Sequence, residues 1–393
     1  MDKTRLKAFK NLNIPAGNKT ILCLDGGGIR GILTIQLLKK LEDVAGIPCY
    51  ELFDFVAGTS TGAIISGLIA SGYKADKIEE IYDQFVNPIF TLRIPIVSGT
   101  KVFIPKFDKK KYREILFKTL NNITLKEACD KTGIDLMITS KDIQEGEETF
   151  FSYFRKRKKN TYGNVLLRAV MESTMSAPTY FHPFERFVDG GVTTFNNPSM
   201  AAIMEACSYG PVAGGKPVFN PEKLTLFSFG TGCSMKFLKP ETAMNFCTAI
   251  DWLGWLLDEN SDDSSDMQTY FLRSGLMKGL DYRRFQSALS GVDIDTLLKN
   301  KLPECSQKVL NQLELIRTDQ ITDMDMADLD YYEISKVLGE LIVEEIIKTQ
   351  KKPFSEDLLN PKTGKDLLIT RKGNVGEIQK NLSDPNWVNA FES

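Results

Sequence analysis

The sequence predicts an α/β fold in three layers, with a mostly parallel central sheet between two layers of helices. Residues 20–24 form a short apolar run that ends at three glycines, and apolar residues then recur at near-helical spacing. Residues 54–65 repeat this order, with an apolar run, a turn of small residues and a helix-like pattern. A strand, a helix and a second strand in this order favour parallel strands, with the connecting helices on the faces of the sheet.

Three more apolar runs predict strands. Residues 134–139 and 149–154 are joined by a polar turn, and residues 224–229 end at a glycine. Open α/β sheets bind their ligands beyond the carboxyl ends of the parallel strands. Because the glycine-rich turns follow such strand ends, we expect a functional site at this edge of the sheet.

Two segments leave alternatives open. Residues 85–107 are apolar but interrupted by prolines, which indicates an irregular loop. This loop is either a lid that faces lipid or an insertion folded back on the core, and we favour the insertion because exposed apolar patches are rare. Residues 246–257 predict a helix that is apolar over most of its surface, which is more typical of a core helix than of one that binds a membrane interface.

We expect three parts along the 393 residues. Residues 1–19 are an N-terminal lead-in, residues 20–348 are the main domain, and residues 349–393 are a polar, loosely packed C-terminal tail. Single α/β domains with insertions reach this size.

The composition predicts a soluble cytoplasmic protein, with peripheral contact to a membrane left open. Apolar residues make up 42% of the chain and charged residues 25%, and the formal net charge of −2 gives no general attraction for a nucleic-acid polymer. The seven scattered cysteines contain no Cys-x-x-Cys pair and indicate free thiols. No targeting segment and no membrane-spanning run is recognisable. The five cations of residues 155–159 are interpreted as a solvated loop rather than as a site for anionic headgroups.

The first candidate for chemistry is the turn Gly58-x-Ser60-x-Gly62. In a nucleophile elbow the serine sits on a strained turn between a strand and a helix, and the flanking glycines allow the tight turn and the approach of a substrate. The alternative is a plain turn, because a pattern with three fixed positions also arises by chance.

A serine that attacks an ester needs donors for the oxyanion and a base for its proton. Gly26, Gly27 and Gly28, before a helix, can direct backbone N–H groups at developing negative charge, and Arg30 adds a cation. Asp189, followed by Gly190 and Gly191, ends a short apolar run. Burial in such a place raises the pKa of a carboxyl group and makes it a better proton acceptor.

The only histidine of the chain is His182, so a Ser-His-Asp triad has no other candidate. His182 precedes Pro183, which favours an extended segment, and we expect it to pack below the Asp189 turn instead of acting as the base. A carboxylate base predicts a pH profile without the inflection near pH ~6.5 that is typical of histidine.

At these residues the sequence resembles the patatin-like phospholipase family, with DGGGIRG at 25–31, ending in Gly31, GTSTG at 58–62 and DGG at 189–191. Weaker similarities extend the resemblance to residues 20–347. It implies a patatin-like catalytic domain and a carboxylic ester hydrolase that cleaves fatty-acyl esters of phospholipids or other acyl lipids. It also implies a Ser60–Asp189 dyad, an oxyanion hole from the first glycine loop, no metal and no cofactor. It leaves any regulatory ligand unspecified.

Two other functions compete with this interpretation. Gly26-x-Gly28-x-x-Gly31 is also the pattern of a dinucleotide-binding turn. That function requires an acid at the end of the next strand, whereas Glu51 and Asp54 lie near its start. The third candidate is a catalytically silent storage or scaffold protein, against which the intact Ser60 and Asp189 argue.

Overall fold

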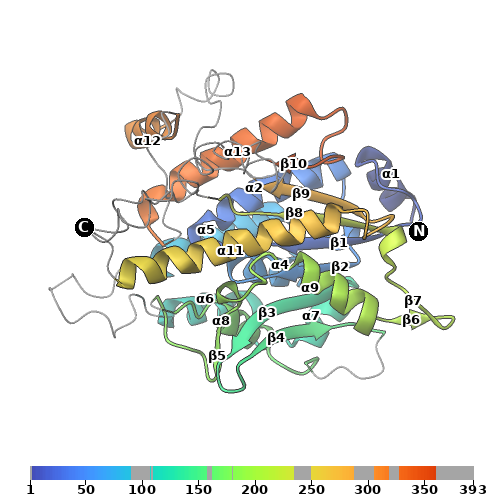
Figure 1. The fold of residues 1–393 in the computed structure, drawn as a ribbon, viewed down its shortest axis with the longest axis horizontal. Coiled ribbons are helices and arrows are strands. Elements are labelled where there is room, and N and C mark those ends of the chain that lie inside the picture. The colour runs from blue at the N-terminus through green and yellow to red at the C-terminus, as the bar shows by residue number, and fades with distance from the viewer. Residues whose placement is uncertain are drawn as a thin grey trace, which may run out of the picture.

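The computed structural model confirms the α/β fold, with a mostly parallel sheet and helices on its faces (Figure 1). The strand order is β10-β9-β8-β1-β2-β3-β4, with β5 beside β3. The pairings of β3 with β4 and β5 are antiparallel, and the other pairings of this sheet are parallel. The structure describes residues 2–89, 107, 109–156, 162–178, 180–233, 249–286, 305–317 and 327–359.

Within the described ranges, eight strands belong to this sheet, and two short ones pair separately. The strands of the sheet are β1 (Lys19–Leu24), β2 (Phe55–Gly58), β3 (Asp135–Asp142), β4 (Glu147–Tyr153), β5 (Phe187–Asp189), β8 (Leu224–Phe229), β9 (Asp281–Gln286) and β10 (Leu358–Leu359). The separate pair is β6 (Val212–Ala213) and β7 (Lys216–Pro217). The strands predicted near residues 20–24, 134–139, 149–154 and 224–229 are confirmed.

The helices follow the strands in the expected alternation over the first part of the chain. Their bounds are α1 (Lys3–Asn11), α2 (Gly31–Ala45), α3 (Cys49–Leu52), α4 (Thr61–Ala70), α5 (Ala75–Ile89), α6 (Lys110–Leu120), α7 (Leu125–Thr132), α8 (Leu167–Thr174), α9 (Ser199–Met204), α11 (Ala249–Arg273), α12 (Gln307–Arg317) and α13 (Tyr332–Thr349). Short 3₁₀ turns are η1 (Gly28–Arg30), η3 (Gly190–Val192), η5 (Pro221–Lys223) and η7 (Leu329–Tyr331), and η4 (Glu205–Tyr209) is a π-helical turn.

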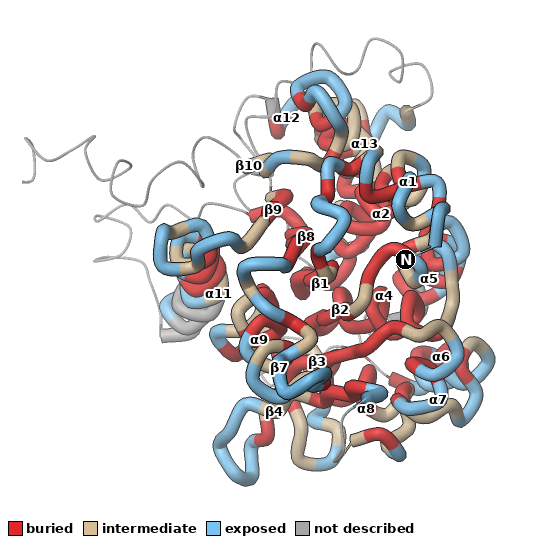
Figure 2. The backbone as a smooth tube through the Cα atoms, turned by 90° about the vertical axis from the view of Figure 1, so that its right-hand side faces the viewer, coloured by how far each residue is buried: buried red, intermediate tan, exposed pale blue. Residues whose placement is uncertain are grey.

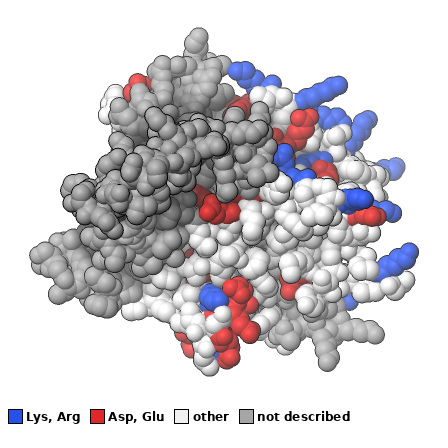
Figure 3. All heavy atoms as spheres, viewed as in Figure 1, with Lys and Arg blue, Asp and Glu red and all other residues white. Residues whose placement is uncertain are grey.

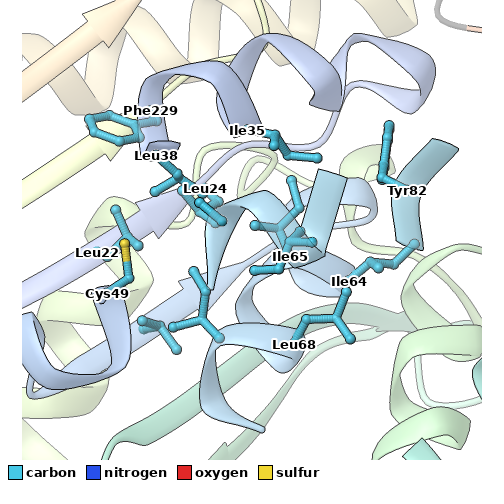
Figure 4. Packing of buried hydrophobic residues seen from close by; sticks show 14 of the residues in the cluster. Leu22, Leu24, Ile35, Leu38, Cys49, Ile64, Ile65, Leu68, Tyr82 and Phe229 are labelled. Carbon is cyan, nitrogen blue, oxygen red and sulfur yellow. The ribbon is translucent and has the colours of Figure 1, made fainter. Parts of the chain in front are cut away.

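The two faces of β1 bury their side chains in two separate cores. Leu22 and Leu24 pack in the larger core with α2 and α4. Figure 4 shows side chains from β1, α2 and α4 packed around Ile65. Ile21 and Cys23 point the other way and pack in the smaller core with α9. This alternation follows from the two-residue period of a strand. Figure 2 shows buried backbone through the middle of the molecule, with exposed positions concentrated at its periphery.

The prediction of an irregular loop from residue 85 onwards is wrong at its start, because α5 continues to Ile89. Phe85 and Val86 are each 1% exposed, and they extend the buried face of Ile81 and Tyr82 by a further helical turn. Burial of this face outweighs the proline at position 88, which lies one residue before the helix ends. Residues 90–106 lie outside the described part, so the preference for an insertion over a lid stays a prediction.

The predicted apolar helix lies at the beginning of α11. Trp252 is 39% exposed, and the side chains of residues 253–259 lie outside the described part, so a core position for this stretch stays a prediction. Further along, Gln268 and Leu272 are buried. Arg155 and Lys156 are exposed, and the rest of the basic run is not among the described residues.

Segments before residue 20 and after residue 348 contribute to the fold. Ala8 and Phe9 of α1 are buried, Phe354 is fully buried, and β10 adds to the edge of the sheet beyond β9. The domain limits at residues 20 and 348 stay a prediction. Figure 3 shows lysines and arginines gathered along the right-hand edge, on the side where α1 lies in Figure 1.

A buried ion pair joins the end of β1 to β9. Arg284 donates from both terminal nitrogens to Asp25, at 2.8 and 2.5 Å, and the two residues are 1% and 3% exposed. The guanidinium also donates to Ser228 Oγ at 2.8 Å and to Ser265 Oγ at 3.1 Å. Burial raises the pKa of Asp25, and the adjacent guanidinium opposes this rise. The pair therefore fixes the residue from which the first glycine loop begins.

Replacing Arg284 by methionine should lower the free energy of unfolding by about 3–5 kcal/mol, because it leaves Asp25 buried without its cation. Urea denaturation at neutral pH measures the change. Arg168→Met is the control, since the partly exposed Arg168 side chain contacts Asn122 and Phe117 and its loss should cost less than about 1 kcal/mol. Equal stability of Arg284→Met and the control would contradict the importance of the pair.

Candidate active site

Ser60 occupies a strained turn between β2 and α4. Its backbone has φ 51° and ψ −121°, in a region that residues other than glycine avoid. Such a conformation costs of order 1–3 kcal/mol and persists only where the surroundings enforce it. Here the Ser60 N–H donates to Thr174 Oγ1 at 2.8 Å, and the side chain is buried, with 8% of the residue exposed. The serine is thus held in one orientation.

The two glycines around Ser60 are required by neighbouring backbone. A Cβ atom on Gly58 would lie 2.3 Å from the carbonyl oxygen of Gly62, and one on Gly62 would lie 2.3 Å from that of Leu24. Such contacts are too short for any side chain. The glycines therefore let the elbow pack on itself and on the end of β1, which is the tight turn expected from the sequence, and the room for a substrate stays a prediction.

Ser60 and Asp189 lie in direct contact. Ser60 Oγ donates to Asp189 Oδ2 at 2.6 Å, and Asp189 Oδ1 accepts the N–H of Gly191 at 2.7 Å. Asp189 is 4% exposed at the end of β5. Burial raises its pKa to about 6, against the lowering effects of the Ser60 hydroxyl, the Gly191 N–H and the charge of Lys109. The carboxyl group is ionised at neutral pH and is a stronger base than an exposed aspartate.

Gly190 allows the Asp189 turn to lie against β3. A Cβ atom on Gly190 would lie 2.3 Å from Thr139 Oγ1 and 2.7 Å from the Thr139 carbonyl oxygen. The backbone of Asp189 donates to the carbonyl of Ser176 at 3.1 Å. Both contacts fix the place of the carboxyl group relative to the sheet.

The first glycine loop lies beside the serine. A Cβ atom on Gly26 would be 3.1 Å from the Cβ of Ser60, so the two turns are nearly in contact. The N–H of Gly26 donates to the carbonyl of Asn196 at 3.3 Å, whereas within the described part of the chain the N–H groups of Gly27 and Gly28 have no acceptor. The Gly27 and Gly28 N–H groups are thus unbonded among the described residues, and the part of Gly26, Gly27 and Gly28 in an oxyanion hole stays a prediction.

The carbonyl groups of the loop are anchored. Gly28 has a backbone φ of 54°, and its carbonyl accepts hydrogen bonds from Thr61 Oγ1 at 2.9 Å and from the Tyr82 hydroxyl. The Gly26 carbonyl accepts a hydrogen bond from Thr231 Oγ1 at 2.9 Å. A Cβ atom on Gly31 would lie 2.0 Å from Thr61 Cγ2, which explains this glycine by packing alone.

The role predicted for Arg30 is not settled by its contacts, and the position predicted for His182 is wrong. Arg30 follows the loop in η1 with its Nε buried and without a partner in the described structure, and no contact with Ser60 or Asp189 is found there. Its part in the oxyanion hole stays a prediction. His182 is exposed, so the expectation that it packs below the Asp189 turn is wrong. The side-chain partners found for Ser60 Oγ among the described residues are Asp189 and Met175 Sδ.

The dinucleotide-binding alternative lacks its acidic residue. Asp54 lies at the start of β2, away from the glycine loop, and its carboxylate pairs with Arg5 at 2.8 Å and Lys19 at 2.6 Å. Across the described ranges, no group of three His, Cys, Asp or Glu side chains could hold a metal, and no helix is long and apolar enough to cross a membrane.

The sequence did not identify Thr174, Asn196 and Thr231 as supports of the site. Each lies far along the chain from the turn that it holds. The only sequence signal was the position of Thr231 in the glycine turn after a predicted strand, at the edge where the site was expected.

Comparisons with known proteins match the region that contains all three glycine motifs. The family described as patatin-like phospholipase matches residues 22–203. Patatin-17 of Solanum cardiophyllum is 28% identical, over 89% of this chain and 87% of that protein. The 85/88 kDa calcium-independent phospholipase A2 of Mus musculus is 32% identical, over 54% of this chain and 27% of that protein. The crystal structure of VipD from Legionella pneumophila covers 94% of this chain and 75% of its own, at 13% identity and a TM-score of 0.38.

The strain at Ser60 predicts an unusual response to glycine. Ser60→Gly should be at least as stable as Ser60→Ala, because relief of about 1–3 kcal/mol of strain offsets the roughly 1 kcal/mol entropic cost of glycine. Ser66, within α4, is the matched control, and there glycine should be about 1 kcal/mol less stable than alanine. Urea denaturation of the four variants decides it. The same glycine penalty at both positions would show that Ser60 is not strained.

Proposed function

Through residues 22–203 the chain belongs to the patatin-like phospholipase family, and we propose that it hydrolyses fatty-acyl esters of membrane lipids with Ser60 as nucleophile and Asp189 as general base. Family membership supports lipid acyl hydrolase activity. The dyad, the oxyanion hole and a phospholipase A-type reaction are the finer parts of the proposal.

The observation that carries the proposal is the 2.6 Å hydrogen bond from Ser60 Oγ to Asp189, made on a strained elbow. In the acylation step, Ser60 Oγ bonds to the ester carbonyl carbon while its proton passes to Asp189 Oδ2. The carbonyl oxygen takes up the negative charge beside the open N–H groups of Gly27 and Gly28. When the carbon–oxygen bond to the alcohol breaks, Asp189 returns the proton to the leaving oxygen.

Deacylation repeats these steps with water. Asp189 takes a proton from water, whose oxygen attacks the acyl-serine, and the proton returns to Ser60 Oγ as the fatty acid leaves. Asp189 is suited to both halves because its pKa of about 6 lies near the operating pH, which lets it accept and return a proton. No histidine is needed in this scheme.

The substrate and surroundings follow from this chemistry as proposals. The substrate is a phospholipid or another acyl lipid, which implies peripheral contact with a membrane from the cytoplasm. The catalytic unit is proposed to span residues 20–348, with the short segments outside it packing on its edge. The alternative of a catalytically silent storage or scaffold protein is supported only by the general fact that a protein can keep this fold without catalysing the reaction.

Ser60→Ala and Asp189→Asn should each abolish hydrolysis of a fluorogenic fatty-acyl ester, because removal of either member of a catalytic unit costs nearly the whole rate. A fluorophosphonate probe should label the wild-type protein at Ser60 and leave Ser60→Ala unlabelled. Ser66→Ala, a buried serine in α4, is the matched control and should keep its turnover. Near-wild-type turnover in Asp189→Asn would show that the dyad is wrongly assigned.

The rate should rise with pH through about 6, where Asp189 ionises to become the base. Such an inflection lies close to that of an ordinary histidine, so the pH profile expected from the sequence alone no longer separates the two bases. His182→Asn does, and it should keep both the turnover and the inflection. A silent but folded His182→Asn would instead require a mechanism through His182.

A further inference from the structure

A buried lysine lies beside the segment that supports Asp189. Lys109 is 8% exposed and directly precedes α6, where a cation opposes the helix dipole. Its Nζ donates to Ser176 Oγ, lies 3.7 Å from Glu172 Oε1 and is 6.0 Å from the centre of the Phe181 ring. Neither burial nor the position before α6 favours a positive charge at residue 109, so the ammonium group must be stabilised by the groups that it contacts.

Ser176 connects the lysine to Asp189. Its carbonyl accepts the N–H of Asp189 at 3.1 Å, and its hydroxyl donates to the carbonyl of Glu172 at 2.7 Å while accepting from Lys109. A second hydrogen bond, from the N–H of Phe107 to the carbonyl of Tyr180 at 3.0 Å, joins the segment before Lys109 to the segment after Ser176. The ammonium group is therefore bound to the neighbour of Asp189 and leaves both Asp189 oxygens to Ser60 and Gly191.

Among the described residues around Lys109, the charges balance only when Asp189 is ionised. Arg113 donates from Nε to both oxygens of the buried Glu172, at 2.9 and 2.8 Å, and this pair neutralises itself. Lys109 is then the second cation and Asp189 the second carboxyl group. Tyr112, also from α6, is buried next to them and contributes a neutral hydroxyl. With Asp189 protonated, the cluster would carry one uncompensated buried positive charge.

We propose that Lys109 is a positioning residue of this site, whose ammonium group holds Asp189 in its ionised, proton-accepting form and fixes its supporting segment through Ser176. The inference rests on the proposed function of the dyad. Burial lowers the pKa of Lys109 to about 8, with Glu172 and Asp189 opposing that effect, so the lysine is mostly charged at neutral pH. In return its charge lowers the pKa of Asp189, against burial.

Lys109→Gln should move the acidic limb of the pH–rate profile of ester hydrolysis to higher pH by about one unit. The loss of rate should be largest below pH 7, where less of Asp189 is ionised, and small above pH 8. Lys109→Arg keeps the cation and should keep the limb in place. Lys111→Gln removes the same charge from an exposed position of α6 and should leave the profile unchanged.

An unmoved limb in folded, active Lys109→Gln would overturn the inference, and so would an equal shift in Lys109→Arg. If Lys109→Gln does not fold, Glu172→Gln decides, because loss of that carboxylate leaves two cations near Asp189 and should move the limb to lower pH. A limb that stays or rises in that variant overturns the inference.

A second measurement separates this inference from the proposed function. With carboxyl-¹³C-labelled aspartate, the Asp189 resonance is identified by its absence from Asp189→Asn, and its titration is followed directly by NMR. A higher pKa in Lys109→Gln than in Lys111→Gln supports the inference even if the wild-type protein hydrolyses no ester, in which case only the function fails. Equal pKa values overturn the inference.

Discussion

The buried ion pair between Asp25 and Arg284 lets the first glycine loop keep free donors. A loop held by its own N–H groups would have none left for a ligand. Here the loop is fixed by the Asp25 carboxylate and by its carbonyls, which accept from Thr231, Thr61 and Tyr82. Ser228 and Ser265 each accept a further N–H from the two terminal nitrogens of the guanidinium, which supports a buried ion pair.

The loop and the serine elbow depend on each other. The elbow packs so closely on the end of β1 that a Cβ atom on Gly62 would lie 2.3 Å from the Leu24 carbonyl and 2.7 Å from that of Asp25. The strained dihedrals of Ser60 are enforced by this packing and by the bond from its N–H to Thr174. Movement of the loop would therefore disturb the elbow, so the proposed nucleophile and the proposed oxyanion donors are held by shared packing.

The sequence predicted what is local and missed most of what is distant, except for the Ser60–Asp189 pair that the family resemblance implied. Strand, glycine turn and helix follow one another within short windows, so the fold and the two turns could be predicted from periodicity and glycines. Arg284 lies 259 residues from Asp25, and Lys109 lies 67 residues from Ser176, and no local pattern indicates such contacts. His182 was misplaced for the same reason, because proline restricts its backbone but does not decide which face of the segment is buried.

The environment of Asp189 resolves a conflict between two requirements of the carboxylate base that we propose it to be. A buried carboxyl group without partners is protonated at neutral pH, and one bound by several donors or a direct ion pair is too weak a base. Asp189 accepts the Ser60 hydroxyl, whose proton it removes in the proposed mechanism, and one N–H. The nearby cation is bonded to Ser176 instead of to the carboxylate. Its field favours ionisation without occupying a lone pair, so the oxygen that faces Ser60 stays able to take the proton.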